Sequence, residues 1–99
     1  MRYWIPTEMQ IGNKKYVVQQ HEKLSNGYDK GVVDVKAKRI ELGKKDVAGS
    51  KFSAEERYET LFHEMTHAIL YEMNHPLWRD EKFVKRFAKH LTDAICTAR

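Results

Sequence analysis

The chain has 99 residues, of which 41% are hydrophobic and 32% are charged, and it carries a net charge of +4 at neutral pH. This length predicts a single domain over residues 1–99 with a modest core, and the composition excludes disordered, collagen-like and membrane-spanning proteins. The mild basic excess can promote nonspecific contact with nucleic acid but does not indicate recognition.

The N-terminus is not expected to act as a signal peptide, because Pro6 and Glu8 interrupt it before an apolar region can form. The single cysteine, Cys96, permits no internal disulfide, which is typical of a reducing compartment. These features predict a cytoplasmic protein.

Short strands are predicted in the first half of the chain. Residues 3–5 and 15–21 are rich in aromatic and β-branched side chains and are separated by Gly12-Asn13, so they predict two strands around a turn. Ser25-Asn26-Gly27 then breaks the pattern. Residues 31–42 predict a hairpin that turns at 35–38, with 39–42 as the last strand. Together with the helices predicted below, these strands indicate an α+β protein with a small antiparallel or mixed sheet in its N-terminal half.

A helix is predicted to begin at Ser53, because Glu56 follows three residues later and completes a capping box. Asn74 and Pro76 predict its end near residue 74. Apolar residues recur at helical spacing and predict the face that enters the core. They are Tyr58, Phe62, Met65, Ile69 and Met73.

His63-Glu64-Met65-Thr66-His67, an HExxH motif, lies within this predicted helix. Side chains four residues apart on a helix project from the same side, so His63 and His67 can bind one metal ion. A glutamate beside such a pair can reach a metal-bound water without being a ligand. The motif therefore predicts a zinc site with Glu64 as general base.

A catalytic zinc usually takes three protein ligands and a water, so one protein ligand has to come from elsewhere. A second, antiparallel helix is predicted from its apolar face, formed by Val84, Phe87, Ala88, Leu91 and Ile95. After a turn at His75-Pro76, a return of about seven residues at 1.5 Å each reaches the level of the motif near residues 81–85. Glu81 is the favoured third ligand; Asp80, which can instead cap the helix, and His75 remain alternatives.

The second predicted helix also carries a basic strip formed by Lys82, Lys85, Arg86 and Lys89. A solvated surface is the simplest interpretation of such a strip, and contact with nucleic acid or an acidic protein is the alternative.

With His63, Glu64 and His67 on one helix and Glu81 on the next, the chain resembles the small gluzincin-type HExxH zinc metallopeptidases, above all minigluzincins and phage- or prophage-encoded proteins. The resemblance covers roughly residues 28–97. It implies an abbreviated zincin-like fold in which His63, His67 and Glu81 bind zinc and Glu64 is the base. It also implies that the last strand, 39–42, lines the cleft with a free edge for an extended peptide. The interval from His67 to Glu81 is shorter than in most gluzincins.

The expected function is hydrolysis of peptide bonds in a peptide or protein substrate, with Glu64 taking a proton from a zinc-activated water. No oxyanion donor is assigned, although Tyr71 and His75 are candidates. The rival expectation is a catalytically inert zinc-stabilised module that binds nucleic acid or a protein through the basic strip. A third is a peptidase kept latent by dimerisation or by its own C-terminal segment.

Overall fold

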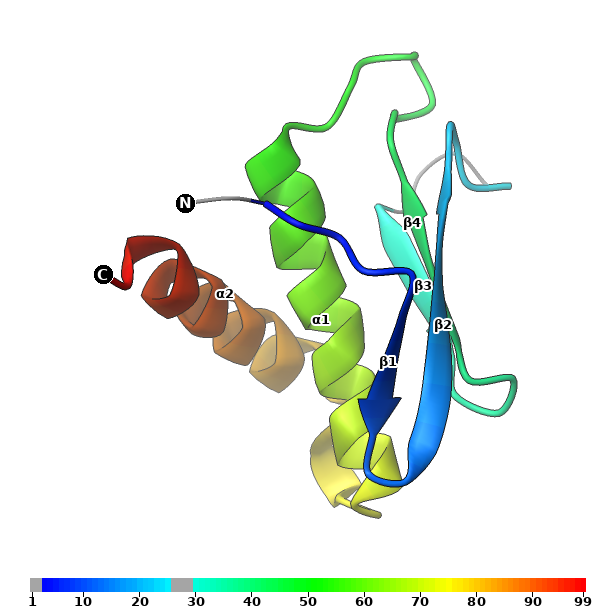
Figure 1. Ribbon diagram of the computed structural model, residues 1–99, viewed down its shortest axis with the longest axis vertical. Helices are drawn as coiled ribbons and strands as arrows, with labels where there is room; N and C mark the ends of the chain where they lie inside the picture. Colours follow the sequence, from blue (N-terminus) through cyan, green and yellow to red (C-terminus); the bar gives the residue numbers. More distant parts are fainter. Residues whose placement is uncertain (1–2, 26–29) are drawn as a thin grey trace.

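The computed structural model describes residues 3–25 and 30–99 and has an α+β architecture, as predicted (Figure 1). Among these residues, four strands precede the helices: β1 (Glu8–Ile11), β2 (Lys14–His21), β3 (Gly31–Asp34) and β4 (Arg39–Gly43). The second half contains α1 (Ala54–Glu72), a short 3-10 helix η1 (Pro76–Arg79) and α2 (Glu81–Thr97). In the described part of the chain, no helix combines the length and the apolar character needed to cross a membrane.

The sheet is mixed, with strand order β1-β2-β4-β3. β2 pairs in parallel with β4, whereas the β1–β2 and β3–β4 pairs are antiparallel. β4 therefore lies inside the sheet, and the expectation that residues 39–42 offer a free edge is wrong. The β3–β4 hairpin turns at 35–38 as predicted, and because β4 pairs with β2, it leaves β3 at the edge.

The first strand is also displaced from its predicted position. Residues 3–5 form no strand, and β1 begins at Glu8. Pro6 has no amide hydrogen for a ladder, whereas Met9 and Ile11 alternate towards the core directly before Gly12, whose φ of 63° suits the turn. Of the predicted break at 25–27, residues 26 and 27 lie outside the described residues.

The boundaries of α1 agree closely with the prediction. Ser53 Oγ accepts a hydrogen bond from the Glu56 amide at 3.0 Å, and Glu56 Oε1 accepts one from the Ser53 amide at 3.0 Å. At the other end, Asn74 has a left-handed φ of 54°, and the His75 amide donates to the Leu70 carbonyl at 2.8 Å. Local capping chemistry thus fixes both ends of the helix.

The helix α1 lies between the sheet and α2 (Figure 1). Tyr16 of β2 and Ile40 of β4 are fully buried in a core that also contains Leu61 and Ala68 of α1. The predicted apolar stripe of α1 is only partly right, since Ile69 and Met73 are 39% and 64% exposed. The helix packs against the sheet on one side and against α2 on the other. Leu61 and Ala68 are therefore its most buried apolar residues.

The helix α2 runs back along α1 in the opposite direction. Its first residue, Glu81, faces His63 and His67, and Lys89 Nζ lies 3.9 Å from Glu59 Oε1, nearer the start of α1. Its most buried side chains are Val84, Ala88 and Thr92, whereas Phe87 and Ile95 of the predicted face are 48% and 38% exposed. The antiparallel return predicted from the sequence is therefore present, with its buried face rotated towards Thr92.

Replacement of Gly31 by Ala is expected to destabilise the contact between β3 and α1. A Cβ atom at this position would lie 2.5 Å from Thr60 Cγ2 and 3.3 Å from the Glu41 carbonyl oxygen. Overpacking of this kind costs about 1–3 kcal/mol. Urea unfolding should show this loss, and adding Thr60→Ser, which removes the clashing methyl group, should recover part of it. Equal stability of Gly31→Ala and the wild type would contradict this packing.

Glu72 ties the sheet to the end of α1. Its Oε2 accepts hydrogen bonds from Lys38 Nζ and from the Tyr16 hydroxyl, each at 2.6 Å. These two hydrogen bonds, that from Lys38 first, lower the pKa of Glu72 below its ordinary value of 4.5. Because the folded-state pKa is depressed, the stabilisation is complete above the unfolded-state pKa and is lost as the pH falls through the folded-state pKa.

We therefore expect Glu72→Gln to lower the free energy of unfolding at pH 7 and to differ less from the wild type at acid pH. Urea titrations at pH 7 and at successive values below 4.5 measure this difference. Glu8→Gln is a matched control, because the Glu8–Lys15 pair is 58% and 61% exposed. A difference that stays constant with pH would rule out the ionised Glu72 cluster as its source.

Candidate metal centre

The two histidines of the motif project from one side of α1, with ring centroids 5.0 Å apart. The two side chains differ in their exposure to solvent. The His67 side chain is 10% exposed, and the His63 side chain is 22% exposed. The four-residue spacing predicted this common direction, and both rings line the same cavity.

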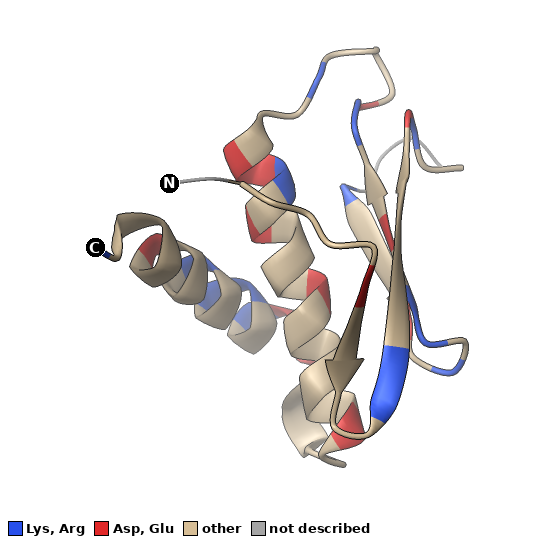
Figure 2. Cartoon of the chain, in the orientation of Figure 1, with Lys and Arg blue, Asp and Glu red and all other residues tan. Residues whose placement is uncertain are grey.

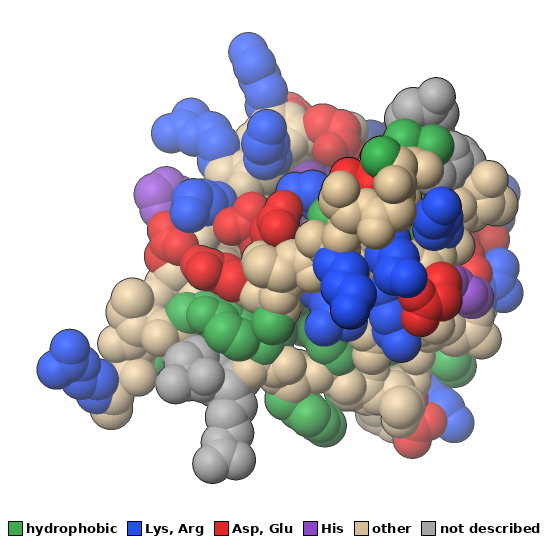
Figure 3. Space-filling model, turned by 90° about the horizontal axis from the view of Figure 1, so that it is seen from above, with side chains coloured by type: hydrophobic (Ala, Val, Ile, Leu, Met, Phe, Trp, Pro, Cys, Tyr) green, Lys and Arg blue, Asp and Glu red, His purple; other side chains and the backbone are tan. Residues whose placement is uncertain are grey.

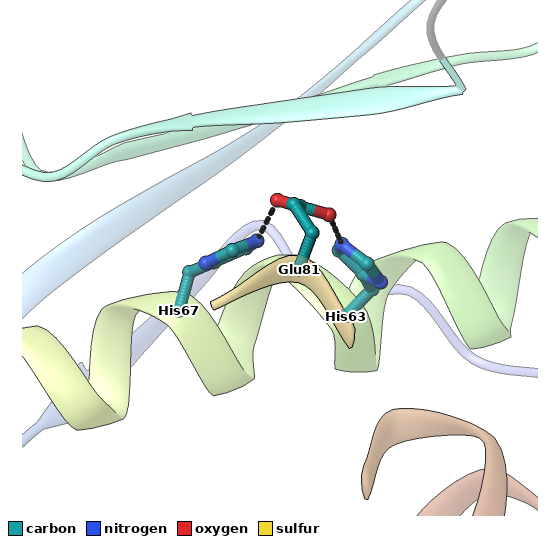
Figure 4. Close-up of side chains that lie close together, drawn as sticks. All are labelled: His63, His67 and Glu81. Carbon is teal, nitrogen blue, oxygen red and sulfur yellow. Dashed lines mark hydrogen bonds and ion pairs between the residues drawn. The ribbon is translucent and has the colours of Figure 1, made fainter. Parts of the chain in front are cut away.

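Glu81 reaches over α1 and places its carboxylate between the two rings (Figure 4). Its Oε1 lies 2.8 Å from His67 Nε2, and its Oε2 lies 3.2 Å from His63 Nε2. One ligand atom from each residue lies within 4.8 Å of the others. Tetrahedral zinc ligands at 2.0–2.2 Å from the metal are separated by roughly 3.3–3.6 Å, so small adjustments would accommodate the ion.

The backbone of η1 orients His67. His67 Nδ1 lies 2.6 Å from the Trp78 carbonyl oxygen, which can only accept a hydrogen bond. Nδ1 therefore carries the hydrogen, and in a neutral ring Nε2 presents its lone pair towards Glu81. Because an ionised carboxylate also offers only lone pairs, Nε2 of His67 and the Glu81 carboxylate together form an arrangement that could bind a cation. A carbonyl behind a histidine is the usual outer support of a metal ligand.

His63 is suited to the same role by its environment. Burial lowers the pKa of His63 below its ordinary value, Glu81 opposes this change, and His67 adds to it. The net direction favours the neutral imidazole, which is the form that coordinates a metal. Three donors of the types that zinc prefers, two imidazoles and a carboxylate, thus converge here.

Glu64 borders the same cavity as these three residues and is 7% exposed. The cavity has a volume of about 640 Å³. Residues of α1 line it together with β3 and the preceding Lys30. Its remaining lining residues are Trp78, Arg79, Glu81 and Lys85. A buried glutamate beside a candidate metal position is the arrangement that a general base requires.

The alternative ligands, Asp80 and His75, and the oxyanion candidates, Tyr71 and His75, make other contacts. Asp80 is the N-cap of α2, and its Oδ1 accepts a hydrogen bond from the Phe83 amide at 3.0 Å. His75 caps η1, with Nδ1 accepting from the Leu77 amide at 3.1 Å. Tyr71 packs edge-on against Trp78, with ring centroids 5.0 Å apart. In the described part of the chain, neither Tyr71 nor His75 is among the residues that line the cavity.

Sequence reasoning missed three features of this site: the Trp78 carbonyl, the β3 edge, and the cations Arg79 and Lys85 on the cavity wall. A backbone carbonyl leaves no mark in the sequence. The two cations had a weak signal, since they flank Glu81 at positions −2 and +4.

Comparisons with protein-family models, curated proteins and solved structures gave no match to this chain. The resemblance to gluzincins therefore rests on the motif and its spacing.

Proposed function

We propose that the protein is a zinc-dependent metallopeptidase with an abbreviated zincin-like fold. The observation that carries this proposal is the convergence of His63, His67 and Glu81 beside the buried Glu64. When bound by the three converging side chains, a zinc ion would supply Lewis acidity towards the scissile carbonyl and the attacking water. We also propose that the protein is cytoplasmic.

In this mechanism Glu64 moves the proton. It takes a proton from the attacking water as the carbon–oxygen bond forms, and it gives that proton to the amine as the carbon–nitrogen bond breaks. Glu64 is suited to this exchange by its position, because it lines the same cavity as His63, His67 and Glu81.

The edge strand β3 is the proposed support for an extended substrate. β3 is the outermost strand beside β4, and Gly31, Val32 and Val33 line the cavity. The free backbone groups of an edge strand can pair with a peptide and hold its bonds at a fixed distance from the site. The role first expected for residues 39–42 thus passes to β3.

Metal analysis and a peptide-cleavage screen test the proposal. Purified protein should contain close to one zinc ion per chain and should cleave some members of a broad peptide mixture. A chelator should stop cleavage, and added zinc should restore it. A folded protein that neither binds zinc nor cleaves any peptide with zinc present would overturn the proposal.

A second candidate is an inert zinc-stabilised module that binds single-stranded nucleic acid through α2. The observation that favours it is an aromatic pair in basic surroundings: Phe83 and Phe87 stack with centroids 5.8 Å apart, and Phe87 is 48% exposed. Lys82, Lys85, Arg86 and His90 line the same hollow, as does the acidic Asp80. Figure 2 shows basic segments on successive turns of α2. In the face shown in Figure 3, Lys and Arg side chains are spread widely, with Asp and Glu among them.

Exposed aromatic rings and cations are the elements that bind unpaired bases and phosphates. A labelled oligonucleotide should then bind with an affinity that falls steeply with salt and that Phe87→Ala weakens. Absence of binding at low salt would exclude this candidate.

A further inference from the structure

Two basic side chains, Arg79 and Lys85, line the cavity near Glu81 in the chain. Arg79 is the last residue of η1, and Lys85 lies one turn after Glu81 in α2. Both are exposed and both line the cavity. The Arg79 guanidinium lies 5.1 Å from the centre of the Trp78 ring, which holds it close to the wall.

In the described part of the chain, neither cation has an ion-pair partner. Within residues 3–25 and 30–99, no carboxylate forms an ion pair with Arg79 or Lys85. Lys30, the third cation of the cavity, differs, because its Nζ pairs with Glu56 Oε2 at 3.2 Å. Unpaired positive charge is therefore concentrated on the side of the cavity formed by η1 and α2.

The summed charge of the cavity lining also favours an anionic ligand once a metal ion is bound. Its lining contains three basic side chains (Lys30, Arg79, Lys85) and three acidic ones (Glu59, Glu64, Glu81), which balance. A divalent ion at the candidate centre would leave a net positive charge. A concave site of one sign attracts ligands of the other sign.

We propose that Arg79 and Lys85 select peptides that carry a carboxylate close to the bond to be cleaved. This inference rests on the proposed peptidase function. A peptide in the cavity would lie between β3 and the wall that carries these two residues. Arg79 offers a planar fork that matches a carboxylate, and Lys85 adds a point charge. The carboxylate can belong to an Asp or Glu side chain or to the C-terminus of a peptide.

Binding to a non-cleaving protein tests the inference separately from hydrolysis. The zinc-loaded Glu64→Gln variant is titrated with fluorescent peptides whose ends are blocked and which differ only in Glu against Gln. A third peptide has Gln and a free C-terminus. A hydrogen bond to a charged group predicts about 10-fold or more tighter binding of the acidic peptide, with the preference falling as salt rises. The third peptide shows whether a terminal carboxylate serves as well as a side chain.

Arg79→Gln combined with Lys85→Gln should reduce the preference to within about 2-fold. Lys82→Gln is the matched control, since Lys82 lies on the same helix, outside the candidate metal centre's cavity, and should leave the preference unchanged. Equal affinity for all three peptides, no binding of any of them, or a preference that survives the double substitution would overturn the inference. If the preference is present but the wild type cleaves no peptide, the carboxylate site stands and the peptidase proposal fails.

Discussion

Replacement of Glu64 by Gln is expected to abolish peptide hydrolysis while the protein still binds zinc. Gln has nearly the same size as Glu and fits the position, where Glu64 is 7% exposed, but it cannot accept and return a proton. General base catalysis contributes about 10²–10⁴-fold, so kcat should fall by about that factor with a small change in KM.

The measurement compares cleavage of one identified peptide by the wild type and by Glu64→Gln at equal zinc content. Thermal unfolding of both proteins is the control, because a buried substitution can also change stability. A variant that retains zinc, unfolds at a similar temperature and cleaves at the wild-type rate would eliminate Glu64 as the base. The inert-module candidate predicts that nothing is cleaved by either protein.

Glu81→Gln should weaken zinc binding by more than about 100-fold, above the 10- to 100-fold that an outer partner of a metal ligand typically contributes. The substitution removes the negative charge that lies 2.8 Å from His67 and 3.2 Å from His63. Competition with a zinc-binding dye measures the dissociation constant for each protein.

Asp80→Asn is the matched control for Glu81→Gln. Asp80 caps α2 through its side chain, and Asn is an equally good cap, so both stability and zinc affinity should be retained. A loss of zinc affinity in Asp80→Asn with none in Glu81→Gln would exchange the roles of the two acids.

The same site should make stability depend on zinc. Zinc at 100 times its dissociation constant would stabilise the folded state by about 2.7 kcal/mol. For a chain of this length, each kcal/mol raises Tm by about 4–8 °C, so a rise of roughly 10–20 °C is expected in the wild type. Glu81→Gln should show little rise at the same zinc concentration, and an equal rise in both proteins would contradict the role of Glu81.

Features that depend on neighbours along the chain could be predicted from the amino-acid sequence. The Ser53–Glu56 capping box sets the start of α1, and Asn74 follows directly after its C-cap. The common direction of His63 and His67 follows from helical spacing. The return of α2 was predictable for the same reason, since a known helix end and a fixed rise per residue limit where Glu81 can lie.

Features that depend on contacts between distant segments could not be predicted from the sequence. Pairing of β2 with β4 put β3 at the edge, which no pattern within either strand specifies. The docking of η1 set the Trp78 carbonyl behind His67 and brought Arg79 to the cavity wall. The roles of Glu81 and Asp80 also depend on tertiary contacts, because adjacent acids at a helix start look alike in sequence. Packing of α2 on α1 turns Glu81 towards the histidines, whereas Asp80 caps the helix.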